Sequence, residues 1–118
     1  MEKGNNPLGN IYISHRAIAT IAYQSALESY GVVGLAARNL AEGLVQVIVK
    51  DPTLGVEVSY LGSKLQINLY IIVEYGTRIA SVATSVAESV KFRVEKMTGL
   101  DVDHVNVSVR GLRISNPD

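Results

Sequence analysis

The stretch LYIIVEYGTRIASVATSVAESVKFRVEKMTGL, residues 69–100, decides the fold, because it predicts a strand, a glycine break and a long helix in immediate succession. Residues 69–73 are apolar or β-branched apart from one tyrosine, a composition typical of a strand packed against a core. Gly76 is expected to end that strand, and Thr77 stands where a helix N-cap belongs. Gly99 then supplies the left-handed residue that commonly ends a helix.

The predicted helix has one apolar face. Apolar residues recur at steps of three and four, and we expect the whole row to be buried: Ile79, Val82, Ala83, Val86, Val90, Val94 and Met97. Phe92, the only phenylalanine of the chain, falls on the opposite, polar side of the same helix. Such a ring is either an isolated exposed side chain or part of a contact surface.

The first third of the chain predicts a second amphipathic helix between two short strands. Residues 11–13 form the first expected strand, Ser14 is placed to cap the helix, and Gly31 is placed to end it. Residues 32–36 are the next expected strand. The apolar side of this helix carries Ile18, Ala22 and Ala26. The opposite, polar side carries residues spaced four apart: Arg16, Thr20, Gln24 and Glu28.

Residues 40–50 fit two structures. Leu40, Leu44 and Ile48 are four apart, as on a helix, but residues 45–49 alternate as in a strand. We favour the helix, because the Asp51-Pro52 pair would stop it.

From Gly55 onward the chain alternates apolar and polar residues. Residues 56–60 and 65–73 predict a hairpin that turns at Gly62-Ser63, and residues 105–109 predict a last strand. Each clear strand has one polar face, so the helices cover the sheet on one side only. The expected fold is therefore an α/β (α+β) two-layer sandwich, with a mixed, mostly antiparallel sheet of about five strands and two main helices on one face.

The composition fits a single small domain. Of 118 residues, 47% are hydrophobic, and eleven basic residues balance eleven acidic ones, so no overall field attracts nucleic acid. The chain has no cysteine, no apolar run long enough to span a bilayer, and no apolar segment behind Lys3 to make a secretory signal. We expect an arm at residues 1–8, one domain at 9–114, a tail at 115–118 and a cytoplasmic location.

The residues show no catalytic constellation. Asp101, Asp103 and His104 could ligate a metal, but a polar loop before a strand explains them better. The GVVG sequence at 31–34 resembles the clamp of KH-type RNA modules, yet no basic residues flank it. We therefore expect no enzyme, cofactor or metal, and regard a nucleic-acid-binding module as a lesser alternative.

Surface aromatic residues suggest binding to proteins. Tyr70 and Ile72 add bulk to the polar face of the central predicted strand, with Tyr12 beside them. Together with Phe92 they form the candidate interaction surface, for a protein partner or a second copy of the chain.

Four motifs, in this order, resemble the alkaline shock protein family, also called the general-stress or envelope stress response family of bacteria. They are GNIYIS at 9–14, YGVVGLA at 30–36, INLYIIVEYGTRI at 67–79 and MTGLDVDHVNVSVRGL at 97–112. The chain is most similar to the short branch without extended tails. The resemblance implies a non-enzymatic cytoplasmic protein that self-associates, acts in cell-envelope homeostasis and reaches the membrane periphery through an anchor protein. It also implies an alternative, an accessory partner of a dihydroxyacetone- or fatty-acid-kinase-type enzyme.

Overall fold

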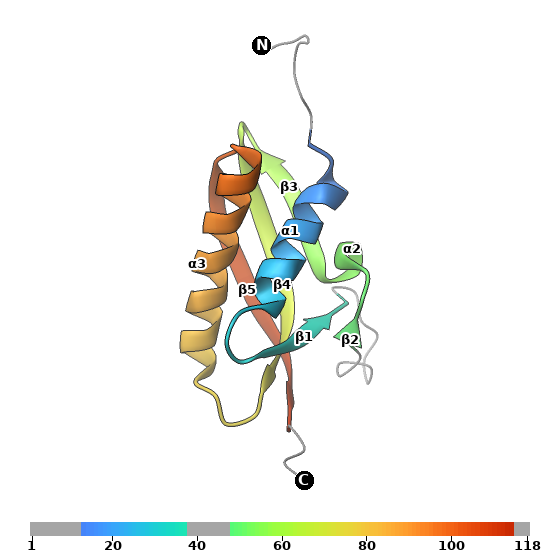
Figure 1. Ribbon diagram of the computed structural model, residues 1–118, viewed down its shortest axis with the longest axis vertical. Helices are drawn as coiled ribbons and strands as arrows, with labels where there is room; N and C mark the ends of the chain where they lie inside the picture. Colours follow the sequence, from blue (N-terminus) through green and yellow to red (C-terminus); the bar gives the residue numbers. More distant parts are fainter. Residues whose placement is uncertain (1–12, 38–47, 115–118) are drawn as a thin grey trace.

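The computed structural model describes residues 13–37 and 48–114. The helices and strands follow one another along the chain (Figure 1) in the order α1 (His15–Leu27), β1 (Val32–Ala36), β2 (Ile48–Val49), α2 (Pro52–Gly55), β3 (Val56–Leu61), β4 (Lys64–Glu74), α3 (Ile79–Thr98) and β5 (Val102–Arg113).

The five strands form one sheet centred on β4. β5 pairs in parallel with β4 from Leu65 to Glu74 and so occupies one whole edge of it. The other edge is shared: β3 pairs antiparallel with residues 64–69 and β1 with residues 71–73, while β2 extends the sheet beyond β1. The sheet is therefore mixed and mostly antiparallel, as predicted.

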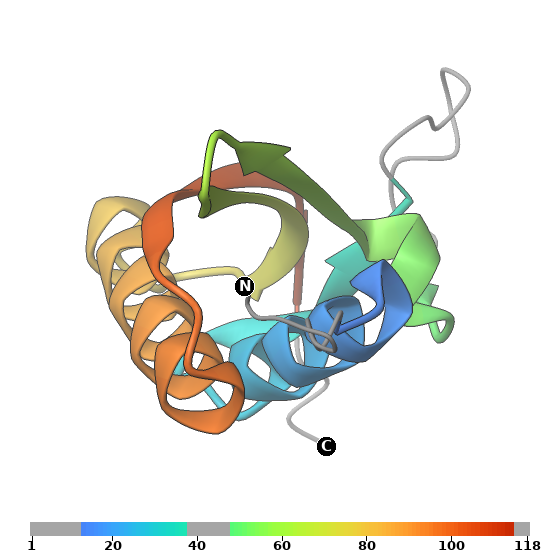
Figure 2. The ribbon, with the colours of Figure 1, turned by 90° about the horizontal axis from the view of Figure 1, so that it is seen from above.

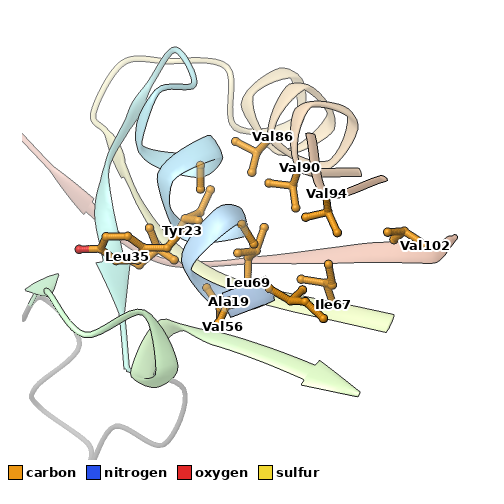
Figure 3. Packing of buried hydrophobic residues seen from close by; sticks show 14 of the residues in the cluster. Ala19, Tyr23, Leu35, Val56, Ile67, Leu69, Val86, Val90, Val94 and Val102 are labelled. Atoms are coloured by element: carbon orange, nitrogen blue, oxygen red, sulfur yellow. The ribbon is translucent and has the colours of Figure 1, made fainter. Parts of the chain in front are cut away.

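The two long helices lie antiparallel on one face of the sheet (Figure 1), and the view along the long axis shows the other face uncovered by helices (Figure 2). Between the layers, alternate residues of β4 are fully buried: Leu65, Ile67, Leu69, Ile71 and Val73. Val86, Val90 and Val94 of α3 point toward Ile67 and Leu69 (Figure 3). Burial of each such side chain stabilises the fold by about 1.5–3 kcal/mol. The two-layer sandwich is confirmed.

The predicted helix ends are mostly confirmed. The Ser14 side-chain oxygen accepts a hydrogen bond of 3.0 Å from the Ala17 amide, and Gly99 adopts φ 77° at the end of α3. The expected cap at Thr77 is wrong. Arg78 is the N-cap of α3, without a side-chain cap, while the Thr77 hydroxyl donates to the Glu74 carbonyl at 2.7 Å and tightens the preceding turn.

The apolar row of α3 is buried only along its middle. Val82, Val86, Val90 and Val94 are buried, but Ile79 and Met97 are 43% and 62% exposed, so the prediction is wrong at both ends. The two ends are exposed for different reasons. Ile79 lies in the first turn of α3, whose 20 residues extend past the end of the 13-residue α1, whereas Met97 lines a groove between the two helices.

The preference for a helix over residues 40–50 is wrong where the structure describes them, because Ile48–Val49 is strand β2. Residues 38–47 lie outside the described residues, as do residues 11 and 12 of the predicted first strand. Asp51 begins a helix instead of stopping one. Its carboxylate accepts hydrogen bonds from the Thr53 hydroxyl and amide, which hold the pKa of Asp51 below its usual value, and Arg16 adds to this effect.

The two glycines of the GVVG sequence allow close packing. Gly31 adopts φ +87° in the turn after α1, and a Cβ there would lie 2.7 Å from the Val82 side chain. A Cβ on Gly34 would lie 2.7 Å from Cγ2 of Ile48 on the neighbouring strand β2. A side chain at either position would collide with its neighbour, so both positions require glycine. Gly31 is also required by its positive φ.

We predict that Gly34→Ala lowers the free energy of unfolding by about 1–3 kcal/mol, because the new methyl group must displace Ile48. Urea denaturation measures this, with exposed Ser63→Ala as the control expected to change little. Adding Ile48→Ala should make the double variant less unstable than the two single changes predict together. Simple additivity would contradict the proposed contact.

Candidate functional site

The uncovered face of the sheet carries a hydrogen-bonded row that crosses three strands. Asn106 of β5 donates to Asn68 of β4 at 2.9 Å, and Asn68 donates to the Glu57 carboxylate of β3 at 3.2 Å. Tyr70 also donates to that carboxylate, at 3.3 Å. The Arg110 guanidinium lies 4.7 Å from the centre of the Tyr70 ring, within cation–π distance. The predicted role of Tyr70 as a protruding aromatic residue is therefore weakened, since its ring and its hydroxyl both have neighbours on the sheet.

His104 stands at the end of the same face. Its Nδ1 lies 2.7 Å from the Asp103 carboxylate and its Nε2 lies 3.0 Å from the Gln66 amide nitrogen. A neutral imidazole with its proton on Nδ1 satisfies both contacts. No group of three or more metal-ligating side chains occurs in the part of the chain that the structure describes.

Ile72 is not part of an exposed surface. Its side chain is 0% exposed, so its inclusion in the interaction surface is wrong. In the register of the sheet Ile72 lies between Gly34 of β1 and Gly111 of β5, neither of which has a side chain. Ile72 therefore fills a space that its neighbours leave open. Tyr12 lies outside the described residues.

Phe92 is exposed, as expected. It is 64% exposed on the outer side of α3, with the Lys96 ammonium 5.6 Å from the ring centre. Phe92 belongs to the helix layer and Tyr70 and Ile72 belong to the sheet, so these three residues lie on different layers of the fold.

A groove that sequence reasoning missed lies between the two long helices. The groove has a volume of ≈ 330 Å³ and is lined by Thr20, Ile21, Gln24, Glu28, Arg93 and Met97. The Arg93 guanidinium and the Glu28 carboxylate, 2.9 Å apart, bridge the two helices there. Met97 was the available signal, but its position in the apolar row led to a prediction of burial.

We predict that Ile72→Ala and Phe92→Ala have opposite consequences for stability. Ile72→Ala should lower the free energy of unfolding by about 2–5 kcal/mol, because it opens a cavity. Phe92→Ala should change it by no more than about 0.5 kcal/mol. Urea denaturation of both variants checks this, and equal losses would contradict the assignment of Ile72 to the interior and Phe92 to the surface.

The fold has solved counterparts. The C-terminal domain of MamM matches with a TM-score of 0.52 over 83% of this chain and 99% of that domain, at 15% identity. At this identity the likeness shows the fold alone. No helix within the described residues is long and apolar enough to cross a membrane.

Closer relatives are known by sequence. Protein YloU of Bacillus subtilis (strain 168) is 42% identical over 111 residues, which are 92% of each chain. Protein Spy1614 of Streptococcus pyogenes serotype M6 is 32% identical over 114 residues, covering 95% of this chain and 94% of the relative. Residues 3–114 match a single family model. The chain therefore belongs to the alkaline shock protein 23 family, which is described as having a cell envelope-related function.

Proposed function

We propose that this protein acts in a process of the cell envelope by binding proteins, not by catalysis. Family membership supports the envelope context. Binding to proteins is supported by Phe92, a large aromatic side chain that is 64% exposed on a helix whose opposite side is already packed. Aromatic side chains in such positions are frequent anchors of protein interfaces.

The surroundings of Phe92 suit a protein contact. Ser81, Ser85 and Glu88, on the same side of α3, are exposed, and they leave the ring standing above short or polar neighbours. A partner with an apolar pocket could cover the ring while the polar neighbours remain at the rim of the interface. Lys96 would add a positive charge beside it.

The same proposal gives the protein its place in the cell. The protein works in the cytoplasm, self-associates or binds a protein partner, and reaches the inner face of the membrane through an anchor protein. Envelope effects then depend on protein contacts, not on direct insertion into lipid.

We predict that Phe92→Ser reduces recovery of the partner at least about tenfold, the effect of losing roughly 1.4 kcal/mol at an interface anchor. The measurement is affinity capture from the native cell, followed by reassembly of the identified partner with purified protein. Leu61→Ser is the matched control, because Leu61 is also exposed, at 56%, but lies on the β3–β4 hairpin.

Membrane fractionation provides the second measurement. Wild-type protein should fractionate with membranes from cells and should not bind purified lipid vesicles. Phe92→Ser should shift it to the soluble fraction if the anchor binds this helix. Unchanged capture together with unchanged fractionation of Phe92→Ser would contradict the assignment of α3 as the partner-binding side.

A further inference from the structure

Strand β5 lies at an edge of the sheet. In the part of the chain that the structure describes, β5 pairs with β4 alone, although it has 12 residues. A long edge strand presents unpaired backbone N–H and C=O groups to any other strand that can align with them. Proteins normally protect such edges with proline, lysine, bulges or a covering segment.

The protection of this edge is confined to its two ends. The register with β4 shifts once at Asp103 and again at Arg110, so the extra residues bend the strand there. Between the shifts, residues 104–109 (HVNVSV) run in regular register and contain no proline, lysine or acidic residue. This segment offers about 20 Å of regular, open edge.

The apolar side of this segment is also incomplete. Val105, Val107 and Val109 pack against the core cluster but are only partly buried, unlike their fully buried neighbours in β4. Their position at the edge is the reason, since no strand among the described residues continues the apolar layer beyond β5. A further strand in register would cover them.

The charges at the ends of β5 specify which strand fits. Asp101 and Asp103 lie at its start, and Arg110 and Arg113 lie at its end. An antiparallel second copy would bring the acidic end of each strand to the basic end of the other. A parallel copy would instead place like charges together, which is unfavourable.

We propose that the open edge of β5 binds the β5 edge of a second copy of this chain, antiparallel and about a twofold axis near Val107. The two sheets then form one continuous sheet with the helices of both copies on the same side. This inference rests on the proposed function and specifies self-association as one of its contacts.

Helix α3 would extend the interface. The Glu95 carboxylate accepts a hydrogen bond of 2.9 Å from the Val102 amide, so this side of α3 lies over the start of β5. This side of α3 continues toward its start through Lys91, Glu88 and Thr84, at steps of three and four residues, and all three are exposed. A stable dimer buries about 1,200–2,000 Å², which strand pairing alone does not supply.

Crosslinking tests the geometry, because the chain has no cysteine of its own. Single variants Asn106→Cys, Val107→Cys and Ser108→Cys are oxidised in dilute solution, with Thr20→Cys on exposed α1 as the control. Wild-type protein should have twice the 12.7 kDa mass by light scattering, and at least one edge variant should form a disulfide-linked dimer while the control does not. A strictly monomeric wild type, or crosslinking no better at the edge than at Thr20, would overturn the proposal.

Charge reversal tests the orientation. Asp101→Arg/Asp103→Arg makes both ends of β5 basic, and Arg110→Asp/Arg113→Asp makes both ends acidic. Each variant alone should dimerise at least about tenfold more weakly than the wild type, and an equimolar mixture should recover a mixed dimer. If either variant, folded by circular dichroism, dimerises as well as the wild type, the antiparallel edge is wrong.

Failure here is distinguishable from failure of the proposed function. Phe92→Ser should leave the wild-type mass unchanged, because Phe92 is not at the β5 edge. Partner capture lost in Phe92→Ser but retained in the charge variants separates the two surfaces.

Discussion

The parallel pairing of β5 along the whole of β4 is the constraint on which the rest of the structure depends. Two adjacent parallel strands need a connection that returns the chain to the starting end, and α3 is that connection. A strand of 11 residues covers about 36 Å and a helix of 20 residues about 30 Å, so the length of α3 follows from the length of β4. The pairing also leaves the remaining edge of β4 to be shared by β1 and β3, and the outer edge of β5 without a partner among the described residues.

This arrangement explains why the two faces of the sheet differ. The helices fill the inner face with aliphatic side chains, whereas the outer face is closed by contacts within the sheet itself. Asn106, Asn68 and Glu57 bond in a row across three strands, and Ile72 fills the space above two glycines. The side chains of the outer face thus largely contact one another within the sheet. This favours α3 and the β5 edge as surfaces for partners.

Periodicity in the sequence predicted the hairpin, the last strand, both long helices and the one-sided sandwich, because these depend on local alternation between apolar and polar residues. It failed where burial depends on a neighbouring element. Met97 has the correct helical phase but lies at the open groove between the two long helices, and Ile72 has the phase of the polar face but lies between Gly34 and Gly111. Thr77 likewise bonds back to Glu74 and leaves the cap to Arg78. Neither the register of a strand nor the packing of one helix against another can be read from a window of sequence.

The motifs that carry the family resemblance serve mainly to build the fold. The glycines of GVVG are required by Val82 and Ile48, IIV in the central strand is buried, and the glycine of MTGL ends α3. Such residues show how the chain folds without showing what it binds. DVDHVNVSV is the exception, since it combines a packing role with an open edge and an acidic end that matches the basic end of a second copy. Phe92 lies outside every motif. Protein contacts specific to this chain are therefore best sought at Phe92, and contacts between copies at the β5 edge.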